Sequence, residues 1–313
     1  MLIESGTHAP DVPTDIFDGP PGTALRFERP DPRVANFVSD YFVYDSEGPA
    51  RMGSIEWAMP GSAALRFFFG ERPYNVWMGS RAYTPIPAAA LYGPTGRASR
   101  FETFGGVTVG MSITALGWAR LMRTSAQQCC DRVLAINAAI PGDFGQRLFD
   151  VIAATDKGPQ VKAALDGFFL DNLGEPHPDE PKIAQVMTLI VDETVEGLKE
   201  IADRMELTPQ QLRTLSLRYF GFPPKRLLRR ARFLRSLLRM YAAGGEADYS
   251  LRAHSYFDVS HFLRDAEEFL GTTPRRFMAR QTPFLRHIIR ARTAVFGVPA
   301  QALIPVGGGS TER

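Results

Sequence analysis

Positively charged side chains that could bind phosphate are concentrated in the last third of the chain. Between Lys199 and Arg292 the sequence has 19 Lys and Arg residues against 9 Asp and Glu, a balance of +10, whereas the remainder has 17 against 25. Cationic groups at such density attract polyanions, because contact with a nucleic-acid backbone releases its condensed counterions. The asymmetry predicts a nucleic acid as the partner of the basic segment. The alternative interpretation is that these arginines only keep surface helices solvated.

Residue patterns that carry enzyme chemistry are missing from the sequence. The five histidines do not combine with Cys or Glu at spacings that bind a metal ion. A nucleophile elbow, a glycine-rich nucleotide fingerprint and a placed pair of carboxylates are absent as well. We therefore expect a protein that is not an enzyme and that holds no metal or cofactor.

The two cysteines, Cys129 and Cys130, are neighbours in the chain. Adjacent cysteines rarely bridge and two thiols make no disulfide framework, so they indicate a reducing compartment. They are either oxidant sensors or small apolar residues beneath a helix. The first residues lack a basic start followed by an apolar stretch, and no run of eighteen apolar residues occurs. The expected location is the cytoplasm, without contact to a membrane.

Short β-like runs separated by Gly- and Pro-containing turns fill the first half of the chain. They predict six strands, at residues 54–59, 63–69, 74–78, 88–92, 100–104 and 107–113. Such spacing is typical of a small antiparallel sandwich or barrel. The apolar period predicts flanking helices at residues 31–41, 115–122, 144–152 and 161–169.

Aromatic side chains recur at alternating positions in these strands. They either line an effector pocket or belong to the ordinary core. The candidates for the pocket are Trp57, Phe67, Phe69, Trp77 and Tyr92.

An acidic, proline-rich break at residues 174–181 predicts the domain boundary, because a residue before proline disfavours helix. Five segments are expected in all. They are a loose leader at 1–30, a β-rich sensor or partner domain at 31–173, the linker at 174–181, a helical domain at 182–292 and a flexible tail at 293–313.

Two similar stretches lie fifty residues apart in the helical domain. Each copy is a short helix with a capping residue, closed by Gly and then by Pro. The matching pairs are Thr208 and Asp258, Leu212 and Phe262, Gly221 and Gly271, Pro224 and Pro274, and Arg226 and Arg276. Residues 198–202 precede the first copy at the spacing of a helix-turn-helix. Residues 223–241 predict a basic amphipathic helix that joins the copies.

Three motifs in this region resemble the DNA-binding domain of AraC/XylS-type transcription regulators. They are GFPPKRLLR from Gly221, YFDVSHFLRD from Tyr256 and GTTPRRF from Gly271, and the resemblance covers about residues 196–286. The stretches MPGSAALRF from Met59 and GMSITALGWA from Gly110 are similar to the β-rich sensor domain that precedes this module in one branch of the family.

The resemblance implies an α+β protein whose C-terminal all-α domain carries two helix-turn-helix units joined by a linker helix. It implies double-stranded DNA as partner, with recognition helices in successive major grooves. RNA polymerase and a small-molecule effector are further candidate partners, and a dimer through the N-terminal domain is left open. The alternative is a protein-interaction module on an eroded helix-turn-helix pair, with weak or non-specific DNA binding.

The same resemblance assigns roles to side chains, since Arg pairs bidentately with guanine and Gln with adenine. The expected base contacts are Gln210, Gln211, Arg213, Thr214, Ser260 and Arg264. The expected phosphate contacts are Thr208, Arg218, Lys225, Arg226, Arg229, His261, Arg275 and Arg276, with packing at the junction of the units as the alternative for Lys225, Arg226 and Arg229.

The chain departs from the family pattern at several positions. Glu206 and Ser255 stand where a turn glycine with positive φ is usual, at a cost of about 1 kcal/mol each. Ser216 and Ala266 replace a buried Phe in each recognition helix. Three acids, Asp265, Glu267 and Glu268, lie beside Arg264 and are expected to repel phosphate. The second unit is therefore expected to read DNA less well than the first.

Overall fold

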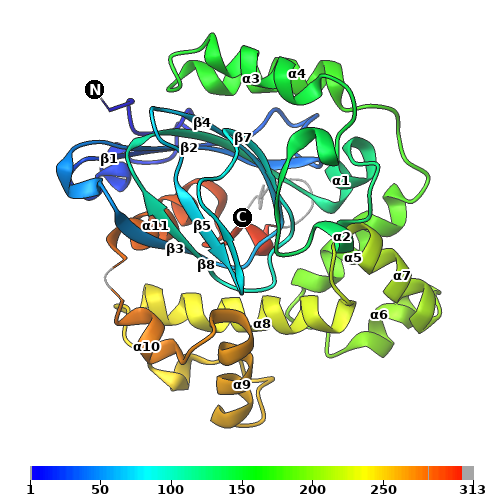
Figure 1. Cartoon of the computed structure of the whole chain (residues 1–313). Coiled ribbons are helices and arrows are strands. Elements are labelled where there is room, and N and C mark those ends of the chain that lie inside the picture. Colours follow the sequence, from blue (N-terminus) through cyan, green and yellow to red (C-terminus); the bar gives the residue numbers. More distant parts are fainter. Residues whose placement is uncertain (1, 281, 305–313) are drawn as a thin grey trace.

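Residues 2–280 and 282–304 are described by a computed structural model with the expected α+β architecture (Figure 1). Two antiparallel sheets occupy the first half of the chain. The larger sheet has the order β1 (Thr23–Glu28), β2 (Val38–Ser46), β9 (Gly106–Ile113), β4 (Ala63–Phe69), β7 (Ala89–Tyr92) and β10 (Val133–Ala135). The smaller sheet has the order β3 (Ser54–Ala58), β8 (Ser99–Thr103), β5 (Asn75–Met78) and β6 (Arg81–Tyr83).

All six predicted strands form, whereas the prediction of a helix at residues 31–41 is wrong. Val38 and Tyr41 belong to β2, where Tyr41 pairs with Met111 of β9. The run from Val38 to Tyr44 is rich in β-branched and aromatic residues, which pack well on a pleated sheet. That preference outweighs the apparent helical period.

The predicted loose leader is also corrected by the structure. Residues Thr23–Glu28 form β1, which pairs with β2 over its whole length. A bridge from Gly6 to Arg26 ties the residues before it to the same edge. The prediction failed because the Pro- and Gly-rich composition hides a six-residue strand with five buried positions.

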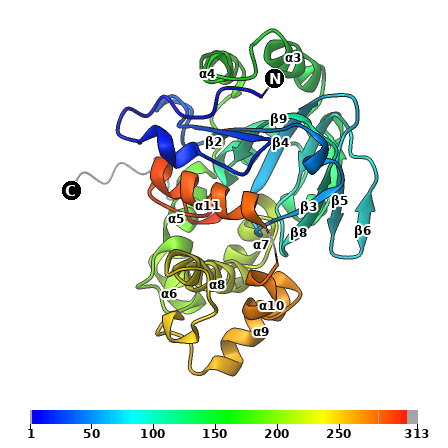
Figure 2. The same ribbon diagram turned by 90° about the vertical axis from the view of Figure 1, so that its left-hand side faces the viewer.

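Helices cover one face of the larger sheet and build the rest of the chain (Figures 1 and 2). Phe149 of α3 contacts Phe67, and Phe169 of α4 stacks on Tyr41. The helices of the first part are α1 (Ala115–Leu121), α2 (Ala126–Cys129), α3 (Phe144–Ala153) and α4 (Gln160–Asn172). Those of the second part are α5 (Glu180–Val191), α6 (Leu198–Arg204), α7 (Pro209–Tyr219), α8 (Pro224–Ala242), α9 (Val259–Leu270), α10 (Pro274–Met278) and α11 (Pro283–Phe296). No helix among the described residues is long and apolar enough to cross a membrane.

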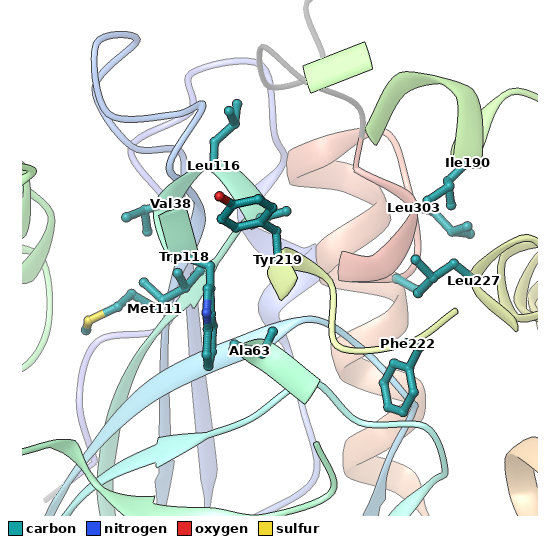
Figure 3. Packing of buried hydrophobic residues seen from close by; sticks show 14 of the residues in the cluster. Val38, Ala63, Met111, Leu116, Trp118, Ile190, Tyr219, Phe222, Leu227 and Leu303 are labelled. Atoms are coloured by element: carbon teal, nitrogen blue, oxygen red, sulfur yellow. The ribbon is translucent and has the colours of Figure 1, made fainter. Parts of the chain in front are cut away.

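One hydrophobic core connects the strands with the helices on both sides of residues 174–181. Trp118 of α1 lies at this junction, close to Tyr219 of α7 (Figure 3). An ion pair from Arg120 to Glu180, with Nε–Oε1 at 2.6 Å, ties α1 to the first turn of α5. The proposed boundary at 174–181 therefore lies between elements that share packing.

The last helix, α11, returns to the first strands of the chain (Figure 2). Arg292 is buried and donates to both carboxylate oxygens of Asp40, at 2.9 and 3.3 Å. Phe296 meets Phe27 of β1 edge to face at 5.9 Å. The flexible tail expected from residue 293 is thus corrected for Thr293–Phe296, which complete α11. Residues 305–313 lie outside the described part of the chain.

The Asp40–Arg292 pair predicts a large loss of stability when one partner is removed. Arg292→Met leaves a buried carboxylate without its cation, which typically costs about 3–5 kcal/mol. We expect the double variant Asp40→Asn/Arg292→Met to recover much of this loss in urea unfolding. Arg290→Met, on the exposed side of the same helix, should change the free energy of unfolding by less than about 0.5 kcal/mol. Equal losses for Arg290→Met and Arg292→Met would contradict this account.

Candidate nucleic-acid interface and enclosed cavity

Helices α6 and α7 form the first helix-turn-helix. Thr208 and Gln211 make a capping box at the start of α7: Gln211 N donates to Thr208 Oγ1 at 3.2 Å, and Thr208 N donates to Gln211 Oε1 at 2.9 Å. Two backbone donors at the helix start are thereby satisfied. Glu206 in the turn has φ of +53°, as expected for a position that favours glycine. The unit therefore keeps the backbone of its turn without the usual residue.

One face of α7 is free to contact a partner. Gln210, Arg213 and Thr214 are exposed, at the spacing that places side chains on one helix face. Arg213 makes no ion pair with any carboxylate in residues 2–280 and 282–304. The amide oxygen of Gln211 is used by the cap, so only its NH2 group remains for a base edge.

The second unit differs from the first in its leading element. A single 3-10 turn, Tyr249–Leu251, stands where a helix would precede α9. The Asp258 carboxylate caps α9 by accepting from His261 N at 2.7 Å, and α9 ends at Gly271 with φ of +69°. Ser260 and Arg264 are exposed on one face of α9, and His261 is half-buried beside Tyr256.

Ser216 and Ala266, which replace the family's buried phenylalanines, are both accommodated in the core. Ser216 is buried, and its hydroxyl donates to the Phe222 carbonyl at 2.7 Å. Ala266 is buried between two rings of α9, Phe262 and Phe269, and Phe233 of α8 lies 5.5 Å from each. An aromatic ring from α8 thus supplies core volume that α9 itself lacks.

The acids of α9 bind α8, which corrects the expectation that they repel phosphate. Asp265 is fully buried and accepts from Arg229 Nε at 2.9 Å and Tyr256 OH at 2.7 Å. Glu268 pairs with Arg226 at 3.0 Å and with Arg229 at 2.6 Å. Only Glu267 of the three acids is exposed.

Most arginines of α8 bind other parts of the protein. Arg230 is buried and donates to the carbonyls of Gly61 at 3.2 Å and Thr95 at 3.0 Å, in loops between strands. Burial lowers the pKa of Arg230 to about 10, so the guanidinium stays charged at neutral pH. Arg226 reaches the Gly96 carbonyl at 3.4 Å. For Arg226 and Arg229 the contacts support packing at the junction, the second of the two roles considered for them.

The remaining expected phosphate contacts have varied surroundings. Four cations that form no ion pair with any described residue are exposed: Arg218, Lys225, Arg275 and Arg276. Thr208 is the N-cap residue of α7, and its hydroxyl accepts from Gln211 N. His261 lies in the first turn of α9, where its backbone N donates to the capping carboxylate of Asp258.

Cys129 and Cys130 lie at the end of α2, which packs against α7, and are not exposed at the surface. Cys129 is buried, and the Cys130 thiol donates to the Gly221 carbonyl at 3.0 Å. Burial, followed by the charge of Asp131, raises the pKa of the Cys130 thiol to about 12. A thiol held in its protonated form reacts slowly with oxidants, which favours the structural interpretation.

A cavity of about 220 Å³ lies between the two sheets and α11. Trp57 and Tyr92, two of the five candidates for a pocket, line it. Phe67, Phe69 and Trp77 lie outside it, which corrects the expectation for these three. Side chains alternate along a strand, so Phe67 and Phe69 face Phe149 of α3, whereas Arg66 and Phe68 face the cavity. Trp77 is covered by Arg100, with Cζ at 3.8 Å from its ring.

Glu56 of β3 is a cavity residue that sequence reasoning missed. Its Oε1 accepts from Phe284 N at 3.4 Å, at the start of α11, where Thr282 provides no side-chain cap. Burial raises the pKa of this carboxyl to about 7, and the α11 amides oppose the shift. Its position between two apolar residues of a strand carries no signal for this role, because α11 is more than two hundred residues away in the sequence.

Solved structures similar to this chain include ToxT of Vibrio cholerae and the AraC-like transcriptional activator CuxR. An apo variant of ToxT is 12% identical, with 83% of this chain and 98% of that chain covered and a TM-score of 0.42. ToxT with a bound unsaturated fatty acid is 12% identical, with 83% and 96% covered and a TM-score of 0.41. CuxR is 13% identical, with 72% and 88% covered and a TM-score of 0.25. No protein-family model and no curated protein matches the sequence.

Glu56 predicts a stability that depends on pH. Its pKa of about 7 in the folded chain exceeds the usual 4.5, so the folded state binds this proton more tightly. The contribution is complete below about pH 4.5 and is lost as the pH rises through 7. Between pH 5 and pH 8, Glu56→Gln should lose less stability than the parent in urea unfolding. Glu71→Gln, an exposed carboxylate in a loop, is the control and should follow the parent; a Glu56→Gln profile identical to the parent's would refute the assignment.

Proposed function

We propose that this protein is a transcription regulator that binds double-stranded DNA sequence-specifically, with α7 and α9 in adjacent major grooves. The observation that carries the proposal is the pair of capped helices, each with a row of exposed hydrogen-bonding side chains. Helix α8 contacts both of them. The charge balance of +10 in residues 199–292 and the resemblance to AraC/XylS-type regulators support the same function.

The side chains on α7 and α9 match the donors and acceptors of base edges. Arg213 and Arg264 suit guanine, and Gln210 suits adenine. Thr214 and Ser260 can hydrogen-bond to either kind of base. The exposed cations at Arg218, Lys225, Arg275 and Arg276 are assigned to phosphates, which fix position rather than sequence.

The N-terminal part is assigned to control of this binding, through an effector in the cavity or through a protein partner such as RNA polymerase. The protein would act in the cytoplasm and would not be an enzyme. A dimer through the N-terminal part is compatible with the assignment.

A second candidate function is a protein-interaction module with weak, non-specific DNA binding. The 3-10 turn in place of a helix before α9 favours it, as does Phe257, which is 93% exposed directly before the α9 cap. An apolar ring exposed to that degree is a usual feature of a protein contact. Titration of a specific site against random-sequence competitor DNA separates the two functions.

The two recognition arginines should differ in their effect on specificity. Arg213→Ala should cost about 1–3 kcal/mol on the specific site and little on a scrambled site, because a bidentate guanine contact is lost. Arg264→Ala should reduce the preference less, since its unit lacks a full leading helix and has the exposed Glu267 nearby. Both variants are titrated against both DNAs at one salt concentration. A larger loss of specificity for Arg264→Ala would reverse the ranking of the two units.

Lys225 and Arg226 are neighbours that should behave differently in salt. Four phosphate contacts would give a slope of roughly −3.6 in a plot of log affinity against log salt. Lys225→Ala should make the slope shallower by about 1, whereas Arg226→Ala should leave it unchanged because Glu268 already pairs with that arginine. The measurement is a salt series of binding titrations on one DNA. A shallower slope for Arg226→Ala would show that its ion pair opens on DNA.

A further inference from the structure

Arg66 is a cation without a carboxylate partner in the wall of the cavity. It lies on β4, and no acid among the described residues forms an ion pair with it. Its guanidinium lies against the rings of Tyr92 at 4.5 Å and of Phe42 and Phe101 at 5.3 Å each. Its Nε is buried and has no hydrogen-bond partner within residues 2–280 and 282–304. Cation–π contacts offset only part of the cost of taking a guanidinium out of water.

Each of the other charged side chains in the lining makes at least one hydrogen bond or ion pair. Arg292 is neutralised by Asp40, and Arg51 donates to the Pro21 carbonyl at 2.9 Å. Glu56 accepts from an α11 amide, and Asp45 accepts from Ile3 N at 2.8 Å. Arg66 is therefore the site where a single negative charge brought by a ligand would be stabilised most.

The rest of the lining selects a small, mainly apolar molecule. Aromatic rings surround Arg66, and Ile288 and Ile289 of α11 form the opposite wall. An apolar cavity of about 150 Å³ holds benzene, so 220 Å³ has room for a benzene ring with a short side chain. Among the described residues, the lining holds one further arginine without a carboxylate partner, Arg51, whose Nε and Nη2 both donate to the Pro21 carbonyl, at 3.1 and 2.9 Å.

We propose that the cavity binds a small organic monocarboxylate with an aromatic or short aliphatic body, whose carboxylate pairs with Arg66. This inference rests on the proposed function only in naming the ligand as the effector. The binding itself is a property of the cavity and does not require DNA.

The walls of the cavity connect the ligand to the second DNA-binding unit. Trp57 in the lining meets Phe277 of α10 edge to face at 5.7 Å, and Arg280 covers its ring at 3.8 Å. Helix α11, which contributes the apolar wall, begins five residues after the last residue of α10, Met278. A ligand that shifts Trp57 or α11 therefore acts on elements that adjoin α9.

The test is direct binding of defined probes to the full-length protein by calorimetry, with the shift in melting temperature as a second readout. The carboxylates are phenylacetate, 3-phenylpropionate, hexanoate and octanoate, and each is compared with its neutral amide. Arg66→Met removes the cation at similar side-chain length. Arg100→Met is the matched control, because Arg100 also covers an aromatic ring but lies outside the cavity.

We expect at least one carboxylate to bind the parent and to raise its melting temperature, at least tenfold more tightly than its amide. The same carboxylate should lose at least tenfold in affinity with Arg66→Met and keep its affinity with Arg100→Met. Absence of binding by all four carboxylates, or equal affinity for acid and amide, would overturn the proposal. The comparison of acid with amide on the parent decides the matter even if Arg66→Met fails to fold. DNA binding is not part of the assay, so failure of the regulator function would leave this result unaffected.

Discussion

Arg230 in the first half of α8 is buried, and its positive charge is stabilised by the carbonyls of two loops between strands. The neighbouring Arg229, which is partly exposed, binds the fully buried carboxylate of Asp265 on α9. A buried guanidinium such as Arg230 or a buried carboxylate such as Asp265 would cost several kcal/mol without its partners, so these bonds favour continued contact of the strands and of α9 with α8. The position of the recognition helices relative to the sheets follows from these bonds.

This use of α8 limits how the protein could make the proposed contacts with DNA. A basic helix is usually interpreted as a surface for phosphates, but ion pairs with Asp265 and Glu268 take up Arg226 and Arg229. The exposed cations proposed to bind phosphate lie near helix ends, Lys225 in the first turn of α8 and Arg275 in the short helix α10. Phosphate contacts at such positions orient a recognition helix in the groove more than they add overall attraction.

A second constraint comes from α11, which closes the space between the sheets. The Asp40–Arg292 pair holds α11 on β2, and the pair is satisfied further by Ser112, whose hydroxyl donates to Asp40 at 2.9 Å. Because α11 follows α10 almost directly, the helix that encloses the cavity is also joined to the unit formed by α9 and α10. The cavity and helices α10 and α11 are thus parts of one packed assembly.

The sequence by itself determined the elements whose signals are local. Alternation and turn residues marked six strands, and the caps at Thr208 and Asp258 and the glycines at Gly221 and Gly271 marked α7 and α9. Tertiary structure decided what depends on partners distant in the chain. Residues Val38–Ser46 form a strand because they pair with a strand on either side. Arg66, and not Phe67, faces the cavity, and Asp265 binds an arginine of α8. The physical reason is that periodicity shows which residues share a face, whereas the charge or ring that each face meets is set by packing between elements far apart in sequence.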